Sequence, residues 1–315
     1  MKAAKDAVNR AESWIFRNGR PLEAALWNAL FKKECGDSVV KILSLYQNED
    51  GGFGNALEPD SWNPESSPYT TLYAIKILQS IKEARSGNPV DEGIYRYIKS
   101  QKDFNPQSGW SFTIKSNSNH PCAPWWIYSA KENKIQGIGL TAEFCSHILT
   151  NHTSDPELFE TAYRLAVVLL AKLKSQTGFG EMGIAGYVTL LETCRKTGLL
   201  SEEKHEGLFR ILSNLILESI EPDVGKWGGY VIRPSKYVSS PDSPFYPLCK
   251  ELMETELDYL IRTQTGEGVW PITWTWMENT AKYPTQFAVS ERWWTAITAI
   301  EKIRLLANFG RLEVN

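Results

Sequence analysis

Four segments of this 315-residue chain repeat one pattern, and the repeat constrains the fold more than any other feature of the sequence. Each copy has an apolar run of helical character, then a glutamine, then a glycine-containing turn that ends in an aromatic residue. The copies are VVKILSLYQNEDGGFG (39–54), IYRYIKSQKDFNPQSGW (94–110), VVLLAKLKSQTGFG (167–180) and LDYLIRTQTGEGVW (257–270). A fifth, weaker copy, ILSNLILESIEPDVGKWGGY (211–230), keeps an aromatic, Trp227, but lacks the glutamine. Because the copies start about 40 to 75 residues apart, each has room for a helix pair and a loop.

The physical role of each residue in the repeat can be inferred from its type and position. The glutamines (Gln47, Gln101, Gln176 and Gln264) are expected at helix C-terminal ends, where their amides can bond free helix carbonyls or the start of the next element. Glycine lets the chain reverse with positive φ, and the aromatic residue packs over the turn.

Further helices are predicted after the turns. They cover residues 66–84, 134–149, 183–198 and 291–309. Ser66 or Ser67 can cap the first of them, with Pro68 at a permitted early position. Since no segment alternates polar and apolar residues over a useful length, a sheet is not expected. The sequence predicts an all-α fold built from helix pairs.

Long segments rich in Pro, Ser, Asn and Trp follow the aromatic turns. They cover residues 54–67, 110–134, 228–245 and 270–290. In an array of helix pairs the turns at one end come together, so these loops are expected to converge. No linker divides the chain, and residues 1–315 are predicted to form one domain.

The repeat also resembles a known superfamily. Gln47 with the GGFG turn at 51–54, and Tyr259-Leu260 with Gln264, Gly268 and Trp270, resemble the Gln–Trp repeats of terpenoid cyclases and protein prenyltransferases, such as squalene-hopene cyclase. GGFG before SSPYTTLYAIKIL is also similar to prenyltransferase β-subunits. The resemblance covers nearly the whole chain through its spacing. It implies a single (α/α)5–6 toroid with long loops at one end, an aromatic-lined central cavity, and an isoprenoid substrate.

The chain departs from the superfamily in its chemical motifs. It has no DxDD acid motif and no DDxxD metal cluster, and triterpene cyclases are about twice as long. His120 and Cys122 lack the spacing of prenyltransferase zinc ligands, and His147, His152 and His205 suggest no obvious third ligand. No cofactor is predicted, and a need for magnesium or zinc is left open.

Charge and hydropathy exclude some classes of function. Lys and Arg number 34 against 37 Asp and Glu, and no basic cluster is present, so nucleic acid is not an expected partner. No apolar run reaches the ~20 residues of a membrane-spanning helix. Asp6 and Glu12 occupy the place of a signal peptide's apolar stretch. Five dispersed cysteines without a CxxC pair favour a reduced, cytoplasmic protein.

The strongest chemical candidate is NALEPDSW, which follows the first glycine turn. Two carboxylates, Glu58 and Asp60, lie close together in an aromatic context, so their pKa values can separate and leave one protonated acid. Asp60 is the predicted acid and Glu58 its tuning partner. The alternative, weighed equally, is a surface turn in which Asp60 caps a short helix. Asn55, Trp62 and Tyr69 are predicted to bind substrate beside them.

The second candidate is SNSNHPCAPWWIYS (116–129). His120, Trp125 and Trp126 are predicted to form a lid or ligand wall, although tryptophans that merely plug the structure fit slightly better. Glu143 in the following helix can face the cavity, whereas an exposed glutamate is the commoner outcome.

The third candidate is WPITWTWMEN (270–279). Trp274 and Trp276 would share one side of an extended segment and could form a cation box or a sugar-stacking platform. Packing under the turn explains Trp270 equally well. Further predicted substrate-binding residues are Trp227, Arg233, Arg292 and Trp293. Either arginine could hold an anion such as diphosphate or make a structural ion pair.

Three functions follow from these features. The first is a terpene cyclase- or prenyltransferase-like enzyme that acts on a hydrophobic isoprenoid through acid-initiated carbocation chemistry. The second is a carbohydrate-active lyase or hydrolase with Glu58 and Asp60 as its carboxylate pair. The third is a non-catalytic toroid that binds a ligand or a protein.

Overall fold

The computed structural model describes residues 1–81, 87–180 and 182–313. Its α-helices are α1 (Lys5–Asn18), α2 (Pro21–Phe31), α3 (Asp37–Leu43), α4 (Pro68–Ser80), α5 (Pro89–Lys99), α6 (Ala130–Asn151), α7 (Pro156–Lys172), α8 (Gly183–Lys196), α9 (Glu202–Ser219), α10 (Lys250–Thr263), α11 (Glu278–Lys282) and α12 (Pro284–Asn308). Within the described residues, the only strands are β1 (Phe104–Asn105) and β2 (Gly109–Trp110), which pair antiparallel. The prediction of a mostly helical chain is confirmed.

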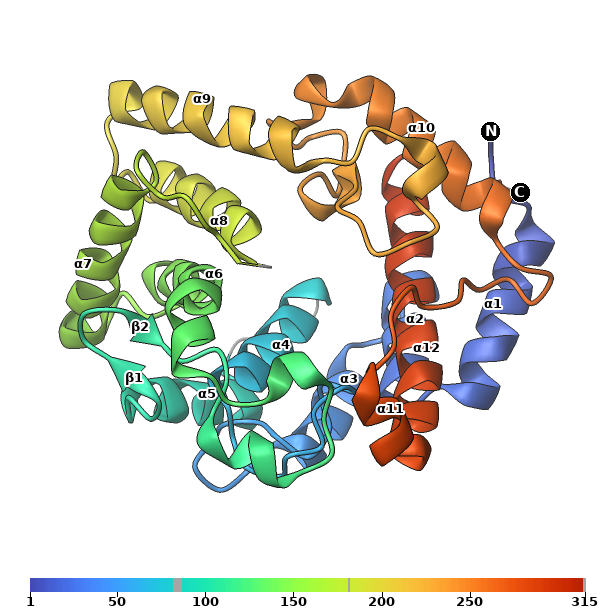
Figure 1. Ribbon diagram of the computed structural model, residues 1–315, viewed down its shortest axis with the longest axis horizontal. Helices are drawn as coiled ribbons and strands as arrows, with labels where there is room; N and C mark the ends of the chain where they lie inside the picture. Colours follow the sequence, from blue (N-terminus) through green and yellow to red (C-terminus); the bar gives the residue numbers. More distant parts are fainter. Residues whose placement is uncertain (82–86, 181, 314–315) are drawn as a thin grey trace.

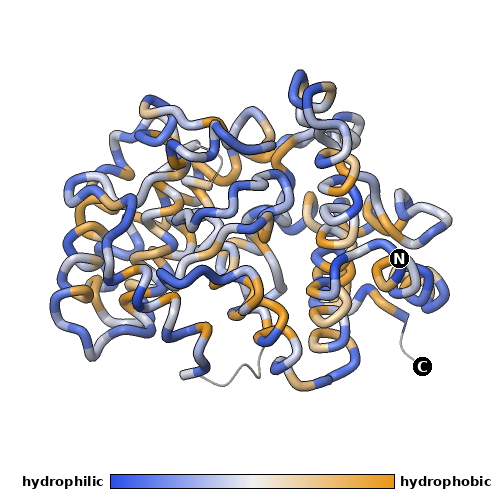
Figure 2. The backbone as a smooth tube through the Cα atoms, turned by 90° about the horizontal axis from the view of Figure 1, so that it is seen from below, coloured by the Kyte–Doolittle hydropathy of each residue, from blue (hydrophilic) through white to orange (hydrophobic). Residues whose placement is uncertain are grey.

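The helices follow one another around the molecule, and the last returns to the first (Figure 1). In this view α2, α4, α6, α8 and α12 lie nearer the centre, while α1, α5, α7, α9 and α10 lie at the periphery. α12 packs against both α1 and α2. The two ends of the chain also meet, because the Ala3 amide donates to the carbonyl of Arg311 at 2.8 Å. Hydrophobic stretches follow the helices, whereas the connecting segments are mostly hydrophilic (Figure 2).

The predicted helices have close counterparts. The helix predicted at 66–84 is α4, whose N-cap Ser67 accepts a hydrogen bond from the Thr70 amide at 3.1 Å. Pro68 is its first residue, and residues 82–84 of the prediction lie outside the described residues. The helix predicted at 291–309 begins earlier, at Pro284. Proline at the first helical position loses no intrahelical hydrogen bond, which explains both starts.

Three of the four repeat glutamines, Gln47, Gln176 and Gln264, donate to carbonyls of their own turns rather than to carbonyls of their helices. The Gln47 amide donates to the Gly51 carbonyl at 2.9 Å and to the Val90 carbonyl, in the first turn of α5, at 3.0 Å. Gln264 makes the same kind of bond to Gly268, at 2.7 Å. Each of these glutamines therefore closes its own turn, whereas the sequence predicted bonds to free helix carbonyls or to the start of the next element. Gln47 also ties its turn to the first turn of α5.

The aromatic residues of the turns belong to the hydrophobic core. Phe53, Trp110, Trp227 and Trp270 are all buried. The Trp270 indole donates to the Leu260 carbonyl at 3.0 Å, one turn inside the helix that precedes it. Of the two interpretations of Trp270, the structure therefore supports packing under the turn.

Candidate functional site

All four long segments were predicted to converge, and three of them do so, at one end of the molecule. The Trp62 amide donates to the carbonyl of Pro121 at 3.0 Å, which joins segment 54–67 to segment 110–134. The Asn279 side chain donates to the Cys122 carbonyl at 2.8 Å, which brings in segment 270–290. Segment 228–245 touches this assembly through the ring of Tyr230, whose centre lies 6.2 Å from that of Trp274.

Asp60 lies at the centre of these contacts. Its side chain is buried, with 2% of the residue exposed. One carboxylate oxygen accepts from the indole of Trp276 at 2.6 Å and from the Ser290 hydroxyl, and the other accepts from the indole of Trp274 at 3.0 Å. Burial raises the pKa of Asp60, and these donors act in the opposite direction. The interpretation of Asp60 as a surface helix cap is therefore wrong.

Glu58, two residues earlier, is equally buried, and one of its two carboxyl oxygens is unbonded in the described part of the chain. It is 2% exposed, and its Oε2 atom has no hydrogen-bond partner among the described residues. Burial raises the pKa of Glu58 well above its ordinary value, and the neighbouring Asp60 raises it further. The pKa of Asp60 is raised less, because more hydrogen bonds to its carboxylate oppose burial, so Glu58 is the stronger candidate for a protonated acid. The sequence favoured Asp60 as the acid, whereas the burial and bonding of the two carboxyl groups favour Glu58.

Arg20 holds the segment that carries both acids. Its guanidinium donates to the carbonyls of Ala56 and Leu57 at 2.9 and 3.0 Å and pairs with Glu23 at 2.7 Å. Asn55 and Ala56 have φ values of 56° and 57°, in the left-handed region that non-glycine residues avoid. The buried arginine thus supplies the bonds that keep this strained backbone in place.

Aromatic side chains that bond to Asp60, or lie next to those that do, form a group that we call the aromatic cage. Trp62 stacks on Trp293 with ring centres 5.6 Å apart and planes 4° from parallel. Trp294 meets Trp274 edge-on at 5.4 Å and Tyr73 at 6.3 Å. The cage consists of Trp62, Tyr73, Trp274, Trp276, Trp293 and Trp294. Trp274 and Trp276 reach the same carboxylate, so the prediction that they share one side is confirmed.

Sequence reasoning missed Arg20, Tyr73 and Ser290. Arg20 had a usable local signal, because it precedes Pro21 at the start of α2 and Glu23 at the third helical position accepts a hydrogen bond from its backbone amide. Tyr73 and Ser290 lie within helices, and no local pattern distinguishes them from packing residues.

The predicted lid residues do not form one unit. Trp126 is buried and packs on Tyr69, with ring centres 4.3 Å apart, so these two plug the structure. Trp125 is 37% exposed, and His120 is half-buried. The alternative of plugging tryptophans is therefore correct for Trp126, and the three residues do not make a common ligand wall.

Several other predicted substrate-binding residues lie away from the cage. Trp227 is buried under its own turn, where its indole donates to the Glu221 carbonyl at 2.8 Å, so it is a packing residue. Asn55 is exposed and donates to the side chain of Asn48. Arg292 is exposed at the surface of α12, next to the cage residue Trp293.

The largest described cavity has a volume of about 840 Å³ and charged walls. Arg233 enters it from segment 228–245 and pairs with the buried Glu256 at 3.4 Å, which confirms the ion-pair interpretation of this arginine. The α12 side of the cavity contributes Glu301, Lys302 and Arg304. Burial, assisted by the charge of Arg233, lowers the pKa of Lys302 to about 8.

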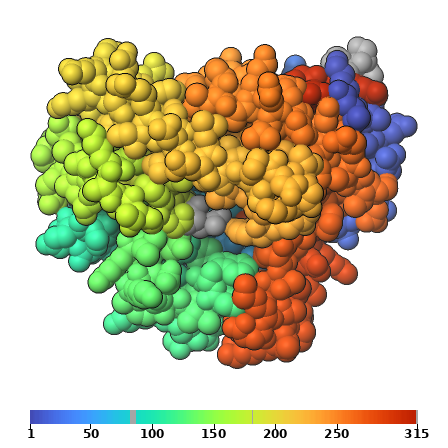
Figure 3. Space-filling view, turned by 45° about the horizontal axis from the view of Figure 1, so that its top comes forward, coloured from blue at the N-terminus to red at the C-terminus, as the bar shows by residue number. Residues whose placement is uncertain are grey.

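A second cavity of about 460 Å³ shares wall residues with the first. Glu143 lines it and pairs with Lys76 at 2.8 Å, so Glu143 faces a cavity rather than open solvent. The space-filling view is hollowed where segments near residues 130, 180 and 240 meet (Figure 3). Tyr230 and Tyr237 are the only aromatic residues among those that line the two cavities. Their walls mix charged and polar side chains with aliphatic ones such as Ile232 and Leu260, whereas the sequence predicted aromatic walls; Trp274 and Trp276 bond to Asp60 instead.

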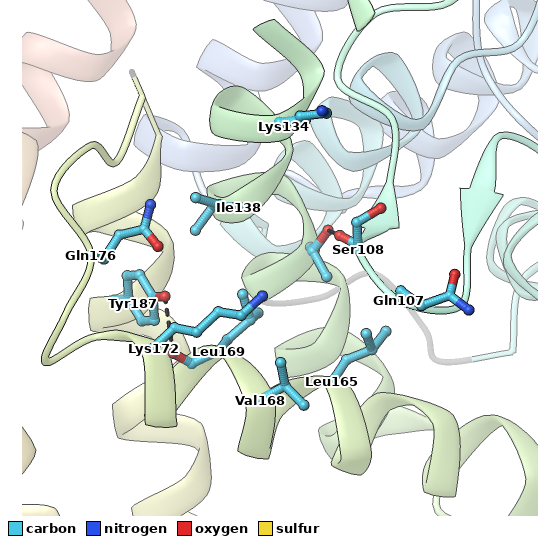
Figure 4. Close-up of a pocket in the computed structure, with 11 residues that line it drawn as sticks. Gln107, Ser108, Lys134, Ile138, Leu165, Val168, Leu169, Lys172, Gln176 and Tyr187 are labelled. Carbon is cyan, nitrogen blue, oxygen red and sulfur yellow. Dashed lines mark hydrogen bonds between the residues drawn. The ribbon is translucent and has the colours of Figure 1, made fainter. Parts of the chain in front are cut away.

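A third, smaller pocket of about 110 Å³ lies between α6, α7 and α8 (Figure 4). Lys134 and Lys172 line it together with Tyr187, whose hydroxyl donates to the Leu169 carbonyl at 3.0 Å. Its apolar wall includes Ile138, and neither Glu58 nor Asp60 reaches it.

The described part of the chain contains no group of three or more His, Cys, Asp or Glu side chains placed to hold a metal ion. In the same residues, no helix has the length and apolar character needed to cross a membrane. No protein-family model matches the chain, and no curated protein matches it. The superfamily resemblance therefore rests on the repeat pattern alone.

Proposed function

We propose that this protein is an enzyme that starts a carbocation reaction on an isoprenoid, with Glu58 as the acid. The observation that carries the proposal is the state of Glu58: a buried carboxyl group with an unbonded Oε2 atom and a strongly raised pKa, next to Asp60. A carboxyl group that stays protonated near neutral pH can donate a proton to a weak base. An alkene is such a base.

The proposed step moves one proton. The Glu58 O–H bond breaks, and the π electrons of a carbon–carbon double bond form the new C–H bond, so the neighbouring carbon becomes a cation. The rings of the aromatic cage stabilise that cation through their electron-rich faces. Transfer of a proton from a later cation to water restores a double bond, and water in turn returns a proton to Glu58. Asp60 keeps Glu58 protonated by holding a negative charge beside it.

The charged cavity supports a substrate with an anionic end, such as a prenyl diphosphate. Arg233, Lys302 and Arg304 line its walls, and α12 runs from the cage to this cavity. Trp294 and Arg304 are ten residues apart on that helix, which is about 15 Å along its axis. An isoprenoid about 15 Å long could place its hydrocarbon end at the aromatic cage and its diphosphate near Arg233 and Arg304.

We also propose that residues 1–315 form a single (α/α)5–6 toroid, as the repeat resemblance implies. The alternation of central and peripheral helices in Figure 1 supports this arrangement, and so does the packing of α12 on α1 and α2. In such a ring the converging loops would cover one end of a central cavity.

The test is product formation in heavy water. Purified protein is incubated in D₂O with farnesyl diphosphate, geranylgeranyl diphosphate or squalene, with and without magnesium, and products are analysed by mass spectrometry. Acid initiation predicts a product that carries one deuterium from solvent and is lost in Glu58→Gln. Glu65→Gln, an exposed glutamate in the same segment, is the matched control and should retain activity. A product without solvent deuterium, or equal activity in Glu58→Gln, would overturn the assignment of the acid.

The polar and charged side chains in the walls of the two larger cavities favour a second candidate, a carbohydrate-active enzyme. Glu143, Thr189 and Glu192 line one cavity with side chains suited to hydroxyl groups. Glu58 and Asp60 would then act as the carboxylate pair. Release of reducing sugar from an oligosaccharide panel, lost in Glu58→Gln, would favour this candidate over the isoprenoid enzyme. If neither panel is converted, a non-catalytic binding protein becomes the better explanation.

A further inference from the structure

The two larger cavities adjoin each other across one loop. Ser235, Lys236 and Ser239 line both of them. Helices α4, α6 and α8 contribute to the smaller cavity and α12 to the larger one, and these helices lie nearer the centre in Figure 1. Their volumes of about 460 and 840 Å³ lie in the range of small-molecule sites, roughly 300 to 1,000 Å³. One ligand can therefore occupy parts of both.

The two cavities differ in charge. The described wall of the smaller cavity is balanced, with carboxylates and lysines in equal number: Glu143, Glu192 and Asp242 against Lys76, Lys196 and Lys236. Cations outnumber carboxylates in the described wall of the larger cavity: Arg233, Lys236, Lys302 and Arg304 against Glu256 and Glu301. Lys302 keeps most of its charge near pH 7, because burial lowers its pKa only to about 8. An anionic group therefore fits the larger cavity, and a neutral polar group fits the smaller one.

Two arginines on the anionic side have unused donors. Arg304 has no hydrogen bond or ion pair among the described residues, although it lines the cavity. Arg233 approaches Glu256 through Nε, at 3.4 Å, and its two terminal nitrogens have no hydrogen-bond partner in the described part of the chain. Guanidinium groups with free N–H donors suit the oxygens of a phosphate group.

Glu143 supplies an unused acceptor on the neutral side. It is only 8% exposed, and its Oε1 atom accepts from Lys76 at 2.8 Å and from the Thr189 hydroxyl at 3.3 Å. Its Oε2 atom has no hydrogen-bond partner among the described residues and is not fully enclosed. Serine hydroxyls from segment 228–245 line the same cavity, namely Ser235, Ser239, Ser240 and Ser243. A nearly buried carboxylate with a free oxygen, among hydroxyl groups, suits a ligand that carries several hydroxyl groups itself.

We propose that the two adjoining cavities bind one phosphorylated sugar. Its phosphate lies on the α12 side, near Arg233 and Arg304, and its hydroxyl groups lie on the α6 and α8 side, near Glu143 and Thr189. This proposal rests on the anion-binding role that the proposed function gives to the two arginines, and it adds a sugar to the phosphate. In an isoprenoid substrate the sugar would be attached to the diphosphate, at the end away from the hydrocarbon. A ligand that fills both cavities should bind more tightly than phosphate or sugar alone.

The first test compares ligands on the wild type. The full chain is titrated calorimetrically at about pH 7.5 with inorganic phosphate, with glucose, and with the 1-phosphates of glucose, mannose and N-acetylglucosamine. The best of the three sugar phosphates should bind at one equivalent and at least about tenfold more tightly than phosphate or glucose. If none of the sugar phosphates binds more tightly than inorganic phosphate, the proposal is overturned. Because this comparison needs no variant, it stays decisive if a variant fails to fold.

The second test assigns the two ends of the ligand. Arg304→Gln should weaken the binding of phosphate and of the sugar phosphate alike, by about tenfold. Glu143→Leu should weaken only the sugar phosphate, because the phosphate does not reach the smaller cavity. Arg292→Gln changes an exposed arginine of α12 that lines neither cavity, so it is the matched control and should bind like the wild type. Unchanged sugar-phosphate affinity in Glu143→Leu would refute the placement of the sugar.

These titrations separate this proposal from the proposed function, since they do not involve Glu58. Tight binding of a sugar phosphate without conversion of any isoprenoid would keep the sugar-phosphate site and remove the carbocation reaction. Conversion of a prenyl diphosphate by a protein that binds no sugar phosphate would do the reverse.

Discussion

The indole Nε1 of Trp276 donates a 2.6 Å hydrogen bond to the carboxylate of Asp60, which lies 216 positions earlier in the chain. Trp274 and Ser290 donate to the same carboxylate, so one buried side chain joins the first long segment to the last helix. The same carboxylate also places a negative charge next to Glu58. Asp60 therefore both holds the site together and sets the chemistry of its neighbour.

Asp60→Asn should lower the free energy of unfolding by about 2 to 4 kcal/mol. Asparagine has one acceptor oxygen, and its NH₂ group would face donors that now point at a carboxylate. Urea unfolding followed by tryptophan fluorescence measures the change. Asp242→Asn, which alters an exposed aspartate, should leave stability within about 0.5 kcal/mol of the wild type. An equally small effect at Asp60 would mean that its hydrogen bonds contribute little.

Glu58→Gln should change the pH dependence of stability in a defined direction. Because the pKa of Glu58 is raised in the folded state, the folded protein binds this proton more tightly than the unfolded chain does. The favourable contribution is complete below the ordinary pKa of 4.5 and is lost as the pH rises toward the raised value. Glu58→Gln should therefore gain stability relative to the wild type between about pH 5 and about pH 8.

Urea unfolding of both proteins at those two pH values measures the difference. Glu65→Gln is the control, because Glu65 is exposed on the same segment. A difference between wild type and Glu58→Gln that stays constant with pH would contradict burial of a protonated Glu58.

Arg20→Met should be among the most destabilising single changes, at about 3 to 5 kcal/mol, because it leaves the buried carboxylate of Glu23 without its cation. It also removes the hydrogen bonds to the carbonyls of Ala56 and Leu57. The double variant Arg20→Met/Glu23→Leu should be more stable than Arg20→Met, since no unpaired charge is left inside. Thermal unfolding of the single and double variants tests this order, and a less stable double variant would refute it.

Gly93→Ala should destabilise the wild type by about 1 to 3 kcal/mol through its effect on Gln47. A Cβ atom at position 93 would lie 2.2 Å from the Gln47 amide nitrogen and would push it away from the carbonyls of Gly51 and Val90. In a Gln47→Ala background the space is free, and alanine favours the helix by about 1 kcal/mol over glycine. Gly93→Ala should then be neutral or stabilising. Equal destabilisation in both backgrounds would show that the clash lies elsewhere.

Much of the fold could be predicted because its signals are local. Ser67 caps α4 because a hydroxyl three residues before the Thr70 amide can reach it in any helix start. Gln47 and Gln264 close turns only four residues long, so spacing alone predicts their place. The aromatic turn residue Trp270 is buried for the same local reason. The mostly helical chain and the convergence of three long segments followed from such patterns.

The sequence by itself determined where helices begin, how the turns close, and that Glu58 and Asp60 lie side by side near tryptophans. Only the tertiary structure decided which of the two acids has the more strongly raised pKa, because a pKa depends on burial and on donors such as Trp276 that lie more than two hundred residues away. The tertiary structure also decided that the larger cavities have charged walls. The periodicity of a helix does not show which of its polar residues will line a cavity. Local hydrogen bonds join residues a few positions apart and can be predicted from their spacing, whereas desolvation depends on the whole folded chain.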